Sequence, residues 1–251
     1  MIRLERDGQL AWLRLDRAAK RNAMTQAMWE ALPPLVEEAV AGGARVLLLA
    51  SAQPGIFCAG ADIAEFGAMT GDPAWRTANR LAIRATQRAL VGAPIPTIAV
   101  VDGDCVGGGC GMALACDLRL ASPRARFGIT PARLGLVYPL HDVALLVDAV
   151  GPAQARRILY TGALLDAAEA LRIGLATELA GEVEEEARAR ALGIAANAPS
   201  SHRASKALVA RVLEGARDDD EASAALFEAA FDGPDFAEGL AAFRERRAPR
   251  F

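Results

Sequence analysis

The sequence has few of the residues that would indicate a metal, a nucleic acid or a membrane as a partner. With two histidines in 251 residues a histidine-rich metal site is excluded, and the four cysteines contain no C-x-x-C pair for zinc. The formal net charge is −3, and Lys and Arg are spread along the chain, so no basic surface for nucleic acid is expected. No uncharged run is long enough to span a bilayer, and the first residues lack the apolar core of a signal peptide. We therefore expect a cytoplasmic protein with no metal, no nucleic-acid partner and no membrane partner.

The cysteines also argue against a disulfide framework. Cys58, Cys105, Cys110 and Cys116 lie in apolar segments rich in small residues, which is typical of reduced, buried thiols in a protein of this size. Hydrophobic residues make up 53% of the chain, which is enough for a substantial core. The chain is therefore expected to be globular and ordered.

A glycine-rich stretch from Thr97 to Ser122 organises the middle of the sequence. An apolar run, Thr97 to Val101, is followed by a triple glycine at 107–109, a segment of small residues and a second apolar run, Leu118 to Ala121. This order predicts a strand, a tight loop, a short helix and a strand. Glycine lets the backbone approach a ligand and a helix start stabilises negative charge, so the stretch is a candidate oxyanion site. The plain alternative is a flexible turn.

A second stretch upstream has the same character. The segment from Ile56 to Ile63 follows a fully apolar strand pattern, Val46 to Ala50, and carries small residues where a ligand would need close backbone contact. Two backbone N–H groups from separate loops can bind one oxygen. The two stretches together therefore favour the oxyanion interpretation.

The remaining patterns predict an α/β protein. Apolar alternation on both sides of Asp7-Gly8 indicates a hairpin, Thr25 is a candidate helix N-cap, and Pro33-Pro34 are expected to kink or break that helix. Asp72-Pro73 begins a longer helix, for which one face is expected to be marked by Trp75, Ala78, Ala82, Ala85 and Ala89. The alternation of strands and helices favours right-handed crossovers and a largely parallel sheet.

The amino-acid composition changes beyond Gly151. Segments rich in Ala, Glu and Arg predict helices over 167–173, 182–197, 201–214, 219–231 and 235–246. We divide the chain into a core of residues 1–195 and a C-terminal helical region of residues 196–251.

Several segments together resemble the crotonase superfamily, also called the enoyl-CoA hydratase/isomerase family. They are Arg21 to Met24, Ile56 to Ile63, the glycine-rich stretch, Phe127-Gly128, Leu134 to Leu136, Gly151, Thr161-Gly162, Ala170 to Leu175 and Pro234 to Gly239. The resemblance covers nearly the whole chain and implies a ββα spiral (superhelical) core followed by the helical region. It also implies that late apolar residues pack partly on a neighbouring subunit, so a homotrimer or a dimer of trimers is expected.

The family acts on acyl groups carried as thioesters of coenzyme A (CoA), which would be part of the substrate, with no separate cofactor. By motif match, the resemblance implies that the amides of Ala61 and Gly108 bind the thioester oxygen. It implies that the backbone around Arg21, Ala23, Ala59 and Ile63 holds the CoA portion, although Arg21 can also be an ordinary surface arginine. Asp62 belongs to the same loop, which we expect it to order by accepting hydrogen bonds from nearby backbone N–H groups.

The sequence departs from the family at the two glutamates with which hydratases activate water. Those positions hold Gly111 and Pro131, which cannot titrate. Asp142 and His141 are the remaining candidates for a single proton shuttle, although Asp142 can also be a first-turn acid that complements the helix dipole, with His141 its surface neighbour. Tyr138 is a donor or a core tyrosine.

Other polar residues are weaker candidates for a role in the site. Glu65 is a candidate for facing the acyl pocket, His202 is interpreted as structural, and Asp104 is a weaker candidate for the chemistry.

The sequence thus predicts an acyl-CoA enzyme that stabilises a thioester enolate, with isomerase-type chemistry favoured over hydration. One alternative is a hydratase with non-standard acid and base residues. The other is a catalytically silent acyl-CoA-binding member of the family.

Overall fold

The computed structural model describes all residues, 1–251, and its strands form two sheets. The larger sheet has the order β1-β2-β3-β5-β7-β10, and the smaller has the order β4-β6-β8-β9. All neighbours pair in parallel except β1 with β2 and β8 with β9. The strands are β1 (Ile2–Asp7), β2 (Leu10–Leu15), β3 (Val46–Ser51), β4 (Ile56–Cys58), β5 (Thr97–Val101), β6 (Asp104–Val106), β7 (Leu118–Ala121), β8 (Arg126–Gly128), β9 (Leu165–Asp166) and β10 (Glu178–Leu179).

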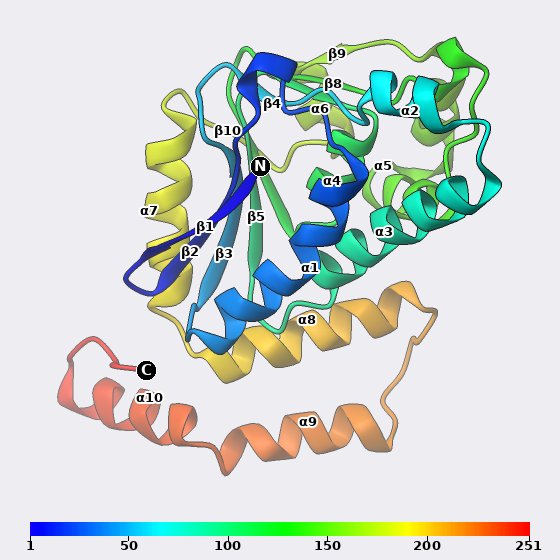
Figure 1. Cartoon of the computed structure of the whole chain (residues 1–251). Coiled ribbons are helices and arrows are strands. Elements are labelled where there is room, and N and C mark those ends of the chain that lie inside the picture. Colours follow the sequence, from blue (N-terminus) through cyan, green and yellow to red (C-terminus); the bar gives the residue numbers. More distant parts are fainter.

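Helices cover both faces of the larger sheet, as Figure 1 shows for α7 on one side and α1 on the other. The α-helices are α1 (Gln26–Ala41), α2 (Ile63–Met69), α3 (Pro73–Val91), α4 (Gly108–Leu114), α5 (Leu140–Thr161), α6 (Ala167–Ile173), α7 (Val183–Ala195), α8 (Pro199–Leu213), α9 (Glu221–Phe231) and α10 (Pro234–Glu245). Successive residues of a strand point to opposite faces. Leu48 therefore belongs to the hydrophobic cluster beneath α7, whereas Leu47 and Leu49 belong to the larger cluster that includes α1.

The structure confirms the hairpin at Asp7-Gly8 and the cap at Thr25, whose hydroxyl accepts the Met28 N–H at 3.4 Å. Of the kink or break expected at Pro33-Pro34, the break is wrong, because α1 runs unbroken from Gln26 to Ala41. Buried residues before and after the prolines, among them Trp29 and Val36, hold both halves of the helix against the core. Tertiary packing thus offsets the hydrogen bonds that the prolines cannot donate.

The expected core face of α3 is only partly correct. Ala82 is buried, but Ala85 is exposed, and the fully buried positions include Asn79, Thr86 and Gln87. The alanine pattern does not predict the whole buried face, because α3 turns a row of polar residues toward the interior.

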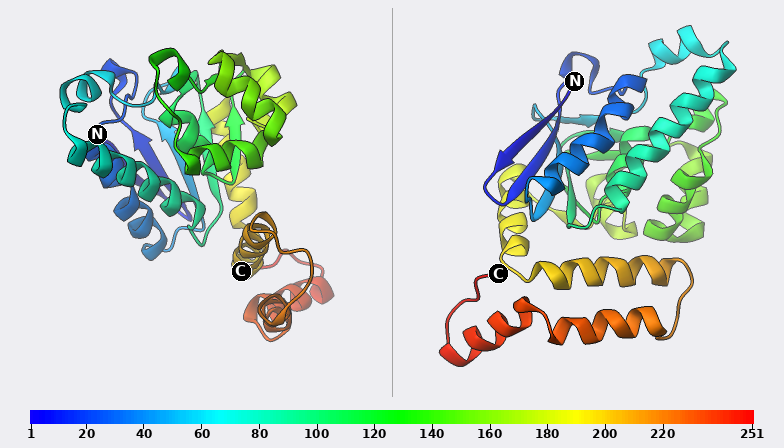
Figure 2. Two further views of the ribbon diagram at one scale, coloured as in Figure 1. Left: turned by 90° about the vertical axis from the view of Figure 1, so that its right-hand side faces the viewer. Right: turned by 60° about the horizontal axis from the view of Figure 1, so that its bottom comes forward.

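The last three helices lie below the rest of the molecule in Figure 1, and Figure 2 shows the same separation from two further sides. On α8, the Lys206 ammonium reaches Asp117 at 2.8 Å. The helices agree with those expected to within a few residues, and Phe227, Phe231 and Phe243 are exposed on α9 and α10. No helix in the chain has the length and apolar character needed to cross a membrane.

Candidate active site

The two loops that resemble an oxyanion site meet through the N-terminal segment. Met24 N–H donates to the Gly60 carbonyl at 2.8 Å, and Asp62 N–H donates to the Met24 carbonyl at 2.9 Å, which forms an isolated parallel bridge between Met24 and Ala61. The bonds flank Ala61 and leave its own N–H facing the opposite side. The backbone on both sides of Ala61 is therefore fixed by the bridge, and the Ala61 N–H takes no part in it.

The second amide is at the start of α4. Gly111 N–H donates to the Gly107 carbonyl at 3.1 Å, so Gly108 lies in the first turn, where amides have no partner within the helix. A Cβ added to Gly108 would lie 2.9 Å from the ring of Trp29 and 3.9 Å from the nitrogen of Ala61. The buried Trp29 ring leaves no room for a side chain at residue 108, and Gly108 and Ala61 lie close together.

Both amides border one cavity of about 380 Å³. Its wall is largely apolar and is built from α1, the corner between α2 and α3, and the segment 130–142. The lining residues are Trp29, Ala59, Gly60, Ala61, Ile63, Phe66, Trp75, Arg76, Asn79, Arg80, Ile83, Gly107, Gly108, Thr130, Pro131, Leu134, Leu136, Val137, Tyr138, Pro139 and Asp142. Asp142 contributes the only carboxylate, so any acid or base chemistry by a carboxyl group in this cavity depends on it.

Asp142 is in the first turn of α5 and is 1% exposed. Its Oδ1 accepts a hydrogen bond from Gln87 Nε2 on α3. Burial raises the pKa of Asp142 above its usual range, and the hydrogen bond from Gln87, the charge of His141 and the Tyr138 hydroxyl act in the opposite direction. A buried carboxylate with a raised pKa is a stronger base than one in water.

His141 lies beside Asp142 but outside the cavity wall. Its Nε2 is 3.2 Å from Asp142 Oδ2 without hydrogen-bond geometry. Burial lowers the pKa of His141; the charge of Asp142 opposes this shift, and the cations Arg84, Arg80 and Arg88 add to it. His141 is thus a neighbour of Asp142 that does not line the cavity.

The space beside Gly111 is occupied by side chains from other parts of the chain, Asp142 among them. A Cβ on Gly111 would lie 2.5 Å from Asp142 Oδ1, 2.7 Å from Gln87 Nε2 and 3.0 Å from the Tyr138 hydroxyl. The volume of a side chain at residue 111 is thus filled by groups from α3, from α5 and from the segment that precedes α5. Pro131 lines the cavity and offers no titratable group.

Of the residues assigned to CoA by resemblance, Ala59 and Ile63 line this cavity, whereas Arg21, Ala23 and Asp62 do not. Arg21 has a left-handed backbone (φ 52°), its carbonyl accepts the Ala59 N–H at 2.9 Å, and its guanidinium pairs with Asp104. Asp104 also binds Arg126 and is accounted for by these ion pairs.

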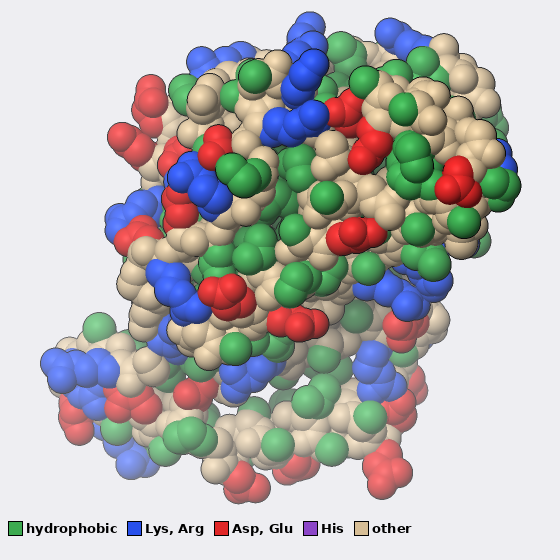
Figure 3. Space-filling view, in the orientation of Figure 1, with side chains coloured by type: hydrophobic (Ala, Val, Ile, Leu, Met, Phe, Trp, Pro, Cys, Tyr) green, Lys and Arg blue, Asp and Glu red, His purple; other side chains and the backbone are tan.

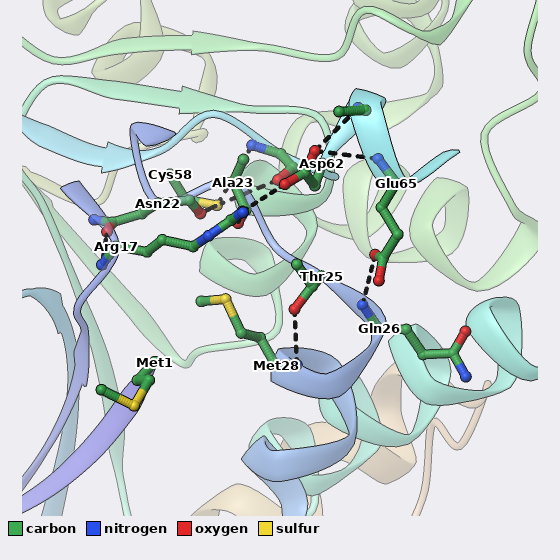
Figure 4. A network of polar contacts seen from close by, with 12 residues as sticks. Met1, Arg17, Asn22, Ala23, Thr25, Gln26, Met28, Cys58, Asp62 and Glu65 are labelled. Carbon is green, nitrogen blue, oxygen red and sulfur yellow. Dashed lines mark hydrogen bonds and ion pairs between the residues drawn. The ribbon is translucent and has the colours of Figure 1, made fainter. Parts of the chain in front are cut away.

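Figure 4 shows how Asp62 orders the loop. Its carboxylate accepts the N–H groups of Ala64 and Glu65 at the start of α2, and it pairs with Arg17 at 2.6 Å, which lowers the pKa of Asp62. Arg17 also donates to the Ala23 carbonyl at 2.7 Å. The expectation that Asp62 bonds nearby backbone amides is confirmed.

The expectation for Glu65 is wrong. Its carboxylate accepts the Gln26 N–H at 2.9 Å and so caps α1, as Figure 4 shows, instead of facing the cavity. The free N–H groups at the start of α1 explain this orientation.

Sequence reasoning missed the polar residues that α3 brings to the site. Arg76, Asn79 and Arg80 line the cavity, and Gln87 holds Asp142. The sequence of this helix has polar residues at helical spacing on both faces. The apolar positions alone therefore do not indicate which polar residues face the site.

Comparison with known proteins places these features in context. A sequence model described as enoyl-CoA hydratase/isomerase matches residues 5–251. The chain is 36% identical to the enoyl-CoA hydratase domain-containing protein 2 of Mus musculus, a mitochondrial protein, over 94% of this chain and 80% of the relative.

Solved structures agree over the whole chain. An enoyl-CoA hydratase/carnitine racemase from Magnetospirillum magneticum has a TM-score of 0.94 and 34% identity, and covers 100% of this chain and 94% of its own. An enoyl-CoA hydratase from Bacillus anthracis has a TM-score of 0.90 and 28% identity, and covers 100% and 98%. The expected α/β crotonase-like fold is confirmed.

Proposed function

The chain belongs to the enoyl-CoA hydratase/isomerase family, and from this premise we propose that it shifts a double bond in an acyl-CoA thioester. The observation that carries the proposal is the single carboxylate, Asp142, in the cavity bordered by the two candidate oxyanion amides. Moving a proton between two carbons of one acyl group needs one base. Hydration needs water to be activated and a proton to be delivered, for which two groups are usual.

In the proposed reaction, the thioester oxygen lies between the N–H groups of Ala61 and Gly108. Asp142 removes a proton from the α-carbon of a 3-enoyl-CoA, and the electron pair moves onto the thioester oxygen to give a dienolate. Protonated Asp142 then returns the proton to the γ-carbon, which leaves the 2-enoyl-CoA. Each preorganised amide contributes on the order of 3 kcal/mol to such a state.

The surroundings of Asp142 support the proposed role as a base. Gln87 fixes one carboxylate oxygen, so the carboxyl group has a defined orientation while its burial favours proton uptake. Much of the cavity wall is apolar, which suits a hydrocarbon segment of the substrate next to Asp142.

The test compares isomerisation with hydration in the same protein. We expect conversion of a 3-enoyl-CoA to the conjugated 2-enoyl-CoA, followed by ultraviolet absorbance, and much slower hydration of crotonyl-CoA. Asp142→Asn should lower the isomerisation rate about 10²-fold or more and leave the affinity for a saturated acyl-CoA within about twofold.

Asp148→Asn is the matched control, because Asp148 is exposed on the same helix and makes no hydrogen bond or ion pair. Its rate should equal that of the wild type. Rapid hydration of crotonyl-CoA would favour a hydratase with non-standard residues, and binding without turnover would favour a silent binding protein. Either result contradicts the proposal, as does an Asp142→Asn variant with full isomerase activity.

A further inference from the structure

Two arginines on the cavity wall have no partner in the protein. Arg76 and Arg80 are one turn apart on α3 and are exposed, both line the cavity, and neither side chain makes a hydrogen bond or an ion pair. This contrasts with Arg17, Arg21 and Arg126 near the same loops, all of which bind Asp62 or Asp104. Two exposed guanidinium groups without a partner in the protein, on the wall of a largely apolar cavity, are a candidate carboxylate site, because guanidinium groups bind carboxylates well through paired hydrogen bonds.

Asn79 lies between these arginines in the sequence and also lines the cavity. It is 3% exposed, and its Nδ2 is buried without an acceptor. A buried donor without an acceptor costs about 1–3 kcal/mol, a cost that an oxygen of a bound ligand would remove.

The charges around the cavity are not balanced by the protein itself. Asp142 is the only acid on the wall, and its Oδ1 is already engaged by Gln87. Glu65, the next acid along α2, is turned to the start of α1. The α3 wall therefore presents two positive charges and one free amide donor to whatever occupies the cavity.

We propose that the acyl group of the substrate ends in a carboxylate, which Arg76 and Arg80 bind while Asn79 donates to one of its oxygens. This inference rests on the proposed function, because it assigns the cavity to the acyl group. The substrate class is then a dicarboxylic acid linked to CoA at one end. A hydrocarbon chain would fill the same apolar wall but would give none of the three donors an acceptor, and Asn79 would stay unpaired.

The experiment measures binding, so that it does not depend on turnover. Glutaryl-CoA and pentanoyl-CoA have acyl chains of equal carbon number and differ in the terminal carboxylate. By calorimetry we expect the wild type to bind glutaryl-CoA at least about tenfold more tightly. The double variant Arg76→Gln/Arg80→Gln should lose this preference and bind pentanoyl-CoA within about twofold of the wild type.

Arg88→Gln is the matched control, because Arg88 is exposed on the same helix and does not line the cavity. It should keep the preference. Asn79→Leu, similar in volume and without a donor, should weaken glutaryl-CoA binding and spare pentanoyl-CoA.

The phosphates of CoA are a second source of negative charge. The same titrations distinguish phosphate binding from binding of the terminal carboxylate. If the arginines bind phosphate, Arg76→Gln/Arg80→Gln will weaken glutaryl-CoA, pentanoyl-CoA and free CoA alike, which overturns the inference. A wild type that prefers pentanoyl-CoA overturns it as well, while leaving the proposed isomerase function intact. A wild type that binds no acyl-CoA refutes the proposed function, and the inference with it.

Discussion

At the scale of single residues, Asp142 has an energetic cost that follows from its burial. Its folded-state pKa is raised above the ordinary value of 3.8, so the folded protein holds this proton more tightly than the unfolded chain does. The free energy of unfolding therefore falls as pH rises from the unfolded pKa toward the folded pKa. We expect Asp142→Asn to raise the Tm at pH 7 and to leave it nearly unchanged near pH ~3, where both forms are neutral.

Thermal unfolding at the two pH values measures this difference, with Asp148→Asn as the exposed control. A Tm for Asp142→Asn that is lower than that of the wild type at pH 7 would show that the carboxylate stabilises the fold. The structural interpretation as a first-turn acid would then be preferred to the catalytic one.

Gly111 offers a second prediction at this scale. Alanine there would place its Cβ within 3.0 Å of three side-chain atoms, and such overpacking costs about 1–3 kcal/mol. We expect Gly111→Ala to lower the free energy of unfolding in urea and to reduce isomerisation by displacing Asp142.

Two further variants test the cause. Gly193→Ala, on α7 with no atom within reach of the added Cβ, should be neutral or slightly stabilising. Combining Gly111→Ala with Asp142→Ala should recover part of the lost stability, because the two side chains compete for one volume. Strictly additive losses would refute this explanation.

The sequence predicted the acid of the cavity but not its supports. Asp142 was a candidate because it follows the pocket segment, whereas Gln87 and Asn79 are far away in the chain and reach the site only through the packing of α3. Contacts of that kind depend on tertiary structure, which no local pattern encodes.

At the scale of elements, α2 depends on its cap. None of its residues is buried, so the bonds from Asp62 to Ala64 and Glu65 contribute much of what holds its first turn. Asp62→Ala should cost about 1 kcal/mol. It should also speed hydrogen exchange over 63–69 and weaken acyl-CoA binding, because Ile63 and Phe66 line the cavity.

Asp72→Ala is the matched control, because Asp72 caps α3 through the Ala74 N–H at 2.8 Å. The body of α3 is anchored by buried residues such as Asn79 and Leu90, so exchange there should not change. Equal effects of the two substitutions on their helices would contradict the dependence of α2 on its cap.

Most elements could be predicted from the sequence because they have strong local signals. The hairpin at Asp7-Gly8 and the strand Thr97–Val101 are examples. The two-residue strands β9 and β10 had no such signal, since they exist only through pairing with β8 and β7. In α5 the positive φ of Gly151 (73°) interrupts the helix, but a second half continues to Thr161.

At the scale of the whole molecule, the C-terminal helices expose an aromatic row. Phe227, Phe231 and Phe236 stack edge to face at 5.3 Å intervals, and Phe227 and Phe231 are 65% and 52% exposed. Figure 3 shows hydrophobic side chains along the lower helices of the same view, among charged ones. Apolar groups gathered in this way favour burial against another protein surface.

We therefore predict a homotrimer or a dimer of trimers in solution, with these phenylalanines at an interface. Phe227→Ser/Phe231→Ser should give a smaller species by light scattering at micromolar concentration. Tyr160→Ser, which changes an aromatic residue that is 77% exposed on α5, should not. A wild-type protein that is monomeric under these conditions would refute the prediction.

The bridge between Met24 and Ala61 joins two segments that leave the ribosome before Gly108 and Asp142 do. One candidate donor is supported by residues from the first quarter of the chain, whereas Gly108 and Asp142 leave the ribosome later. In a nascent chain, the residues that support Ala61 emerge early. The second candidate oxyanion amide, Gly108, is in place only after α4 packs, and the candidate base Asp142 only after α5 packs. If the proposed reaction is correct, the chain can therefore act only after α5 has packed, and thus after the segments assigned to CoA have emerged.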